Sequence, residues 1–173
     1  MKKEYTLTIF SENKTGVLSR VVGIITRRHI NIESISASNS AIEGIHKIMV
    51  VINVTEDMVK KVVATIDKQI DIMKAFYYDK SDIVYQEIAL YKVPTEAFYE
   101  GDTVEKLVRK YDARILRIER QYIVIEKTGH PEQTESLLKE LQDIGIYEFV
   151  RSGAVAIVKP MERFNTYLSE IGN

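Results

Sequence analysis

The sequence predicts an α+β protein built from two ferredoxin-like βαββαβ domains. The order and the number of the expected elements support this fold class. The order strand, helix, strand, strand, helix, strand can be read twice along the chain of 173 residues, in segments of roughly 80 residues each. Each half then predicts four antiparallel strands with two helices on one face of the sheet. We expect one domain over residues 1–79 and a second over residues 80–173.

The first half shows each expected element in turn. Tyr5, Leu7 and Ile9 alternate with Thr6, Thr8 and Phe10, a period of two that predicts a strand. The next apolar residues recur at helical spacing, and Thr55 is a suitable N-cap for a second helix. The expected elements are a strand at 5–10, a helix at 17–25, strands at 31–39 and 46–53 joined by a turn, a helix after residue 55 and a strand at 72–78.

The pattern restarts after the polar linker at residues 79–82. Pro94 ends the next strand, and Pro131 suits the first turn of a helix. We expect the last strand over Gly145–Val158, bent at Gly153, and a tail, Met161–Asn173, that is either a short helix or frayed. The other expected elements are a strand at 83–93, a helix at 102–111, strands at 113–119 and 122–127, and a helix from residue 131. A domain of about 60 residues buries only ~60% of its chain surface, so we expect the domains to recruit further surface by oligomerisation.

Composition and motifs exclude several kinds of chemistry. Lys plus Arg is 24 and Asp plus Glu is 25, a net charge of −1 that argues against a nucleic-acid partner. The chain has no cysteine, so thiolate nucleophiles and cysteine-ligated metals are excluded. His29, His46 and His130 are far apart, and we expect no metal site and no catalytic residues. With no membrane segment, we expect a soluble cytoplasmic protein.

One loop has the features of a binding site. A turn containing Asn13, Thr15 and Gly16 leads directly into the first helix, whose first N–H groups lack intrahelical partners. A carboxylate could accept hydrogen bonds from the N–H groups of Gly16, Val17 and Leu18, and the Asn13 carbonyl could accept one from an ammonium group. An α-amino acid carries both charged groups. The same residues also fit an ordinary turn and helix N-terminus, and both interpretations remain open from spacing alone.

The same stretch resembles a known family. The run Asn13-x-Thr-Gly-Val-Leu-Ser-Arg-Val-x-Gly23, followed by Arg27-Arg28-x-x-Asn31-Ile-Glu-Ser34, resembles the small, regulatory subunit of acetolactate synthase (acetohydroxyacid synthase). Residues 86–93 and the segment Val-Arg-Ser-Gly-Ala-Val-Ala at 150–156 resemble the second half of this family. The resemblance identifies the first domain as an ACT domain, the class of amino-acid sensors, and it covers nearly the whole chain.

The resemblance implies a regulator without an active site of its own. It would bind the catalytic large subunit, stimulate it, and make it sensitive to feedback inhibition by valine, leucine or isoleucine. The ACT domains of two chains would pair, with the effector at the homodimer interface. The implied effector contacts are Asn13, Gly16, Val17 and Leu18 from one chain and Asn31 and Ile32 from the other. No cofactor is expected on this chain, because thiamine diphosphate, magnesium and FAD would belong to the catalytic subunit.

Five positions carry separate expectations. Arg20, Arg27 and Arg28 on the first helix are candidates for contact with the catalytic subunit, although a solvated basic face explains them better. His29 stands where the family usually has Gly, and we expect a left-handed, strained backbone there. Lys14 occupies a loop position that is often acidic or polar in the family, and it could tune the affinity for the effector.

Other functions remain in competition at this point. A stand-alone ACT-domain sensor acting on another enzyme or on transcription would bind an amino acid without affecting acetolactate synthesis. A ferredoxin-like acylphosphatase would need an Arg in the loop after the first strand, where this chain has Lys14. An RNA-binding sheet of this architecture would carry a Lys/Arg-Gly-aromatic run that this sequence lacks.

Overall fold

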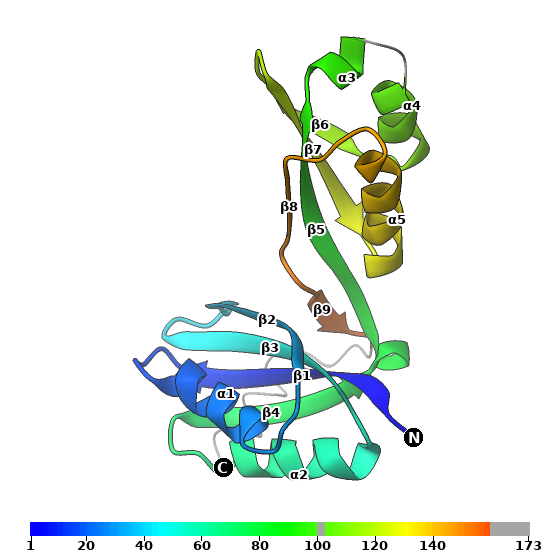
Figure 1. Ribbon diagram of the computed structural model, residues 1–173. Helices are drawn as coiled ribbons and strands as arrows, with labels where there is room; N and C mark the ends of the chain where they lie inside the picture. The colour runs from blue at the N-terminus through cyan, green and yellow to red at the C-terminus, as the bar shows by residue number, and fades with distance from the viewer. Residues whose placement is uncertain (100–102, 160–173) are drawn as a thin grey trace. The chain divides into compact units, whose positions relative to one another are not determined.

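Residues 1–99 and 103–159 are described by the computed structural model (Figure 1). Two compact units result, one of residues 1–84 with the described residues from 156 on, and one of residues 85–155. These units divide the chain differently from the ranges 1–79 and 80–173. The expected tail at 161–173 lies outside the described residues.

The first unit has the expected order of elements and a four-stranded antiparallel sheet. The strands lie in the order β2-β3-β1-β4, so β2 is an edge strand, as the strand order of a ferredoxin-like domain requires. Both helices lie on one face of this sheet (Figure 1). The elements are β1 (Lys3–Glu12), α1 (Val17–Thr26), β2 (Ile32–Asn39), β3 (Ile45–Val54), α2 (Glu56–Ile66) and β4 (Ile72–Asp79).

Alternation along the strands places one set of side chains under the helices. Leu7 and Ile9 of β1 face Val50 and Ile48 of β3 across the pairing, and all four belong to the core of this unit. The stripes of α1 and α2 fill the other side of that core. The period-two and helical patterns read from the sequence therefore correspond to real buried faces.

The second unit repeats the arrangement after the short 3-10 helix η1 (Lys80–Asp82). Its strands lie in the order β6-β7-β5-β8, and β9 also pairs with β5. Apolar residues of α4 and α5 pack with those of β5 and β7 in a separate core. The elements after η1 are β5 (Ile83–Pro94), α3 (Glu96–Tyr99), α4 (Thr103–Lys110), β6 (Arg114–Ile118), β7 (Tyr122–Gly129), α5 (Pro131–Gln142), β8 (Glu148–Arg151) and β9 (Val155–Val158). Residues 83–84 of β5 and 156–158 of β9 belong to the first unit. The prediction of a ferredoxin-like α+β fold is confirmed.

Two details of the second unit differ from the expectation. The single bent strand over Gly145–Val158 was wrong, because β8 and β9 are separate strands interrupted around Gly153. Gly153 has φ of 75°, a left-handed conformation that breaks the ladder instead of bending it. The short helix α3 was also missed, since four residues are too few to show a helical period.

Candidate functional site

The loop before α1 leaves a helix N-terminus open to solvent. Gly16 is the N-cap of α1 with φ of 91°, a left-handed conformation that favours glycine. The first turn of α1 has neither a side-chain cap nor an acidic residue to balance the helix dipole. Asn13, Thr15 and Gly16 are all exposed. The helix therefore presents its positive end to whatever binds at this loop.

The main-chain bonds of the loop identify which N–H groups are available. The Asn13 N–H donates to the Gly44 carbonyl at 3.2 Å, and the Val17 N–H donates to the Lys14 carbonyl at a long 3.4 Å. Within the part of the chain that the structure describes, the N–H groups of Gly16 and Leu18 have no acceptor. These two groups can receive a carboxylate directly.

The side chains of the predicted contacts play different parts. Val17 is buried in the core, so it can offer a ligand only its main chain. Leu18 points outward with 43% of its surface exposed. Asn13 is exposed and free to turn its amide toward a ligand. The loop thus combines two N–H donors, an amide and an apolar side chain.

Asn31 and Ile32 lie at the other end of α1. Asn31 lines a cleft of about 420 Å³ with His29, Asn53 and Met58 among its neighbours, and its Nδ2 donates to Glu33 Oε1 at 3.3 Å. Ile32 packs against the core at the start of β2. Because α1 has ten residues and rises 1.5 Å per residue, it separates the two groups by ~15 Å. The structure of one chain does not bring the six predicted residues around one small ligand.

A charged cluster supports the loop from the side of β4. Lys14 Nζ lies 2.5 Å from Glu12 Oε2 and 3.6 Å from Asp71 Oδ1. Arg20 Nη1 donates to Asp71 Oδ2 at 2.7 Å. The hydrogen bond to Glu12 raises the pKa of the Lys14 ammonium, which is therefore fully charged at neutral pH. Reasoning from the sequence singled out Lys14 and Arg20 but missed Asp71, which contacts both.

Comparison with known proteins decides the family. A model described as an AHAS small subunit-like ACT domain matches residues 7–74, and one described as the small subunit of acetolactate synthase matches residues 86–160. The acetolactate synthase small subunit of Bacillus subtilis is 32% identical over 160 residues, covering 92% of this chain and 91% of that protein. The chain belongs to the acetolactate synthase small-subunit family.

Two further members of this small-subunit family agree with the assignment. The protein from Mycolicibacterium smegmatis is 30% identical over 153 residues, with 88% of this chain and 89% of that protein covered. The crystal structure of the small subunit from Thermotoga maritima superposes with a TM-score of 0.84 at 23% identity, over 92% of this chain and 99% of that one. That structure shares the fold over both units.

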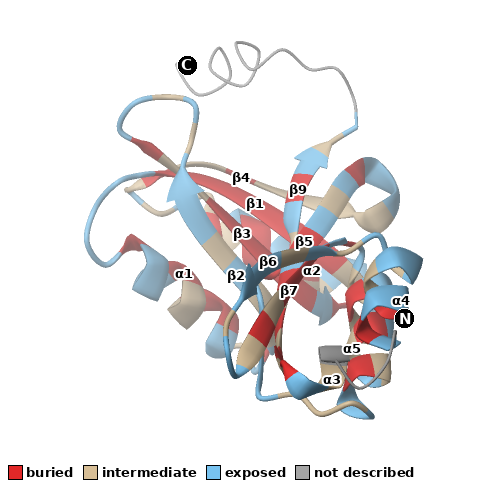
Figure 2. Cartoon of the chain, turned by 90° about the horizontal axis from the view of Figure 1, so that it is seen from above, coloured by how far each residue is buried: buried red, intermediate tan, exposed pale blue. Residues whose placement is uncertain are grey.

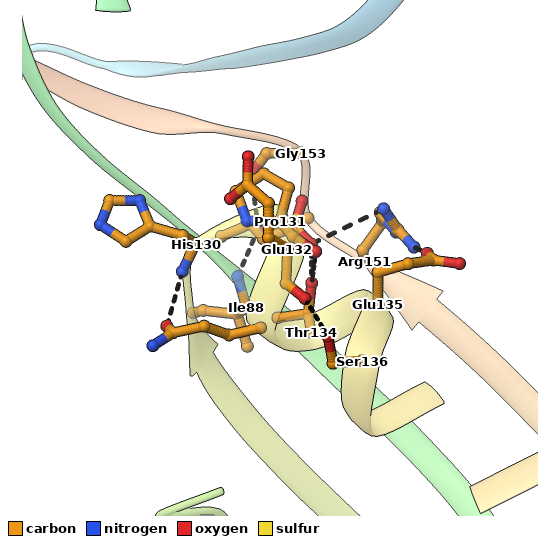
Figure 3. A network of polar contacts seen from close by, with 12 residues as sticks. Ile88, His130, Pro131, Glu132, Thr134, Glu135, Ser136, Arg151 and Gly153 are labelled. Carbon is orange, nitrogen blue, oxygen red and sulfur yellow. Dashed lines mark hydrogen bonds and ion pairs between the residues drawn. The ribbon is translucent and has the colours of Figure 1, made fainter. Parts of the chain in front are cut away.

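The Arg-Ser-Gly segment of this small subunit belongs to a polar network in the second unit (Figure 3). Glu87 of β5 is only 4% exposed, and its carboxylate accepts a hydrogen bond from the Thr134 hydroxyl of α5. Arg151 of β8 lies 3.8 Å from Glu87 and donates to Glu135 at 2.7 Å. A buried carboxylate needs such partners, so the network joins β5, α5 and β8. Its contacts are those of a structural support.

The three candidate arginines differ in the contacts that their side chains already make. Arg20 is bound to Asp71, and Arg28 donates to the Ile24 carbonyl and to the Thr65 hydroxyl of α2. Arg27 is exposed, and its guanidinium makes no hydrogen bond or ion pair with any residue that the structure describes, although its backbone N–H donates to the Gly23 carbonyl. Of the three, Arg27 is the one whose charge is available to a partner.

Proposed function

We propose that this chain regulates acetolactate synthase by binding its catalytic large subunit, stimulating it, and making it sensitive to inhibition by a branched-chain amino acid. The effector part of this proposal rests on the uncapped N-terminus of α1, where the N–H groups of Gly16 and Leu18 have no acceptor among the described residues. The family assignment supports the choice of partner. On this proposal thiamine diphosphate, magnesium and FAD act on the catalytic subunit.

The chemistry of the loop suits an aliphatic amino acid. The effector carboxylate would accept from the Gly16 and Leu18 N–H groups, where the helix dipole also favours an anion. The Asn13 carbonyl would accept from the ammonium group. Leu18, half exposed, would contact an aliphatic side chain better than a polar one. Valine, leucine and isoleucine all have these three groups.

The pairing register supports a site shared between two chains. At one end of the sheet Glu12 pairs with Ile45, and Asn39 of β2 pairs with the adjacent His46. The loop therefore lies at the end of the sheet where β2 finishes, while Asn31 precedes its start. If two copies pair antiparallel through their β2 edges, the start of one β2 lies beside the end of the other. Asn31 and Ile32 of the second chain then reach the loop of the first.

The edge strand itself is suited to such pairing. β2 has one charged residue, Glu33, and none of its residues is buried (Figure 2). Few charges therefore oppose the addition of another strand to this edge. Ile35 on β2 is 37% exposed and Leu18 on α1 is 43% exposed. A second copy would cover both side chains while pairing the free main-chain groups of β2.

Feedback then follows from linkage. The effector can inhibit only if it binds more tightly to the arrangement in which the catalytic subunit is less active. A coupling of ~1–3 kcal/mol between the two binding events changes affinity by about 5- to 150-fold, which is sufficient for control.

Reconstitution with the catalytic subunit of the same organism tests this function. We expect acetolactate formation from pyruvate to rise when the small subunit is added and to fall again as valine is titrated. A Gly16→Val variant is expected to keep stimulation and lose valine sensitivity, because a valine at a φ of 91° is strained, and relief of that strain would displace the Gly16 and Leu18 N–H groups. Absence of stimulation at every ratio would contradict the proposal and favour a stand-alone amino-acid sensor.

A further inference from the structure

Asp71 links the two parts of the loop site through one carboxylate. Its Oδ2 accepts from Arg20 on α1 at 2.7 Å, and its Oδ1 lies 3.6 Å from Lys14 in the loop. Only 15% of the Asp71 side chain is exposed, so its carboxylate is partly shielded from water. The loop and the helix that follows it are therefore held to the same anchor.

The main chain of Asp71 fixes that anchor in place. Its carbonyl accepts from the Glu12 N–H at 3.1 Å, immediately before the loop, and Ile72 begins β4 directly after it. The loop has only one other main-chain bond to a distant residue, from Asn13 to Gly44, among the residues that the structure describes. Asp71 thus contacts the loop at its entry, at Lys14 and at the helix beyond.

We propose that Asp71 is a positioning residue of the effector site, a role that rests on the proposed function and deepens it. By holding Lys14 and Arg20 it orders the loop and the first turns of α1, so that the Gly16 and Leu18 N–H groups are in place before the amino acid arrives. Such preorganisation lowers the cost of binding. This role also gives Lys14 a place in the loop: it ties the loop to Asp71.

Removal of the Asp71 carboxylate distinguishes a positioning role from a purely electrostatic one, because the two roles predict opposite changes in the affinity for the effector. Without Asp71 the charges of Lys14 and Arg20 are no longer balanced, and they would attract the effector carboxylate more strongly. Loss of positioning would instead weaken binding. We expect Asp71→Asn to bind valine roughly tenfold more weakly in calorimetric titration of the full-length protein. Unchanged or tighter binding would overturn the proposal.

Two further variants make the titration specific. Glu43→Gln is the matched control, because it neutralises an exposed carboxylate next to Gly44, whose carbonyl accepts a hydrogen bond from the loop. It removes no ion pair among the described residues, so we expect its affinity for valine to stay within twofold of wild type. Arg20→Met is expected to reproduce the loss, and the double variant with Asp71→Asn to lose little more, because both act through one ion pair. Full additivity of the two losses would count against the proposal.

A measurement without ligand tests the positioning role of Asp71 independently of the proposed function. We expect hydrogen exchange of the Asn13 and Val17 amides to be about tenfold faster in Asp71→Asn than in wild type, with Leu7 in β1 unchanged. If the Asn13 and Val17 amides exchange faster in Asp71→Asn but the wild-type protein binds no valine, Asp71 positions the loop and the loop is not an effector site. Equal exchange and equal valine affinity in both proteins would contradict the positioning role alone.

Discussion

His29 shows how one residue can be placed in a conformation that its side chain does not favour. The residue follows α1, its N–H donates to the Thr26 carbonyl at 2.9 Å, and its φ is 56°. The sequence predicted this left-handed backbone from the resemblance to a family that usually has Gly here, and the structure confirms it. A left-handed residue with a Cβ costs about 1–2 kcal/mol. The backbone conformation of His29 therefore lowers the free energy of unfolding.

We expect His29→Gly to stabilise the first unit. The relief of strain exceeds the ~0.5–1 kcal/mol of extra chain entropy that glycine loses on folding, so a net gain of about 0.5–1 kcal/mol follows. Thermal unfolding should shift upward by roughly 2–8 °C. Arg27→Gly, two residues before His29, is the matched control, since Arg27 has an ordinary helical φ of −61° and this variant should lose stability. A loss in both variants would contradict the strain argument.

Residues of the site differed in how far the sequence could reveal them. Asn13, Gly16 and Leu18 are close in sequence, and the start of a helix can be read from local pattern alone. Asp71 is 51 positions from Arg20, and the two meet only because β1 pairs with β4. An ion pair of this kind depends on sheet pairing, which no spacing rule encodes.

Among the elements, β2 and the end of the chain show where prediction succeeds and fails. The edge position of β2 follows from the strand order that a ferredoxin-like domain requires. The separation of β8 from β9 does not follow from the apolar pattern, which continues through residues 145–158. It depends on the left-handed conformation of Gly153, and composition alone does not distinguish a bend from a break.

A prediction about the edge of β2 concerns the pairing of two copies of the chain. Ile35→Lys places a charge on a strand edge where a second copy would pair, and we expect the proposed homodimer to dissociate at micromolar concentration in sedimentation equilibrium. Valine affinity should fall at least tenfold, because the proposed site needs Asn31 from a second chain. Ile118→Lys on β6, the edge strand of the other sheet and 56% exposed, should change neither quantity. A dimer that survives Ile35→Lys would exclude pairing through β2.

At the scale of the whole chain, two separate cores explain why the sequence could be divided at all. The buried residues of the first unit form one cluster and those of the second another. Each cluster repeats the same alternation of strand and helix stripes, which is the signal that predicted two domains. The polar network around Glu87 completes the second unit without sharing residues with the effector loop. The proposed effector site and the Glu87 network therefore lie in different units, each of which has its own core.

Two conservative substitutions test this distribution. Ile9 in β1 and Ile125 in β7 are both fully buried on central strands, one in each core. Replacing either by Val removes one methylene and costs about 0.5–1.5 kcal/mol, a shift of ~2–10 °C for a domain of this size. In calorimetric unfolding we expect Ile9→Val to lower one transition and Ile125→Val to lower the other. Added valine should raise only the transition that Ile9→Val lowers, because ligand stabilises the part that binds it. A single transition shifted equally by both variants and by valine would show that the two cores unfold as one.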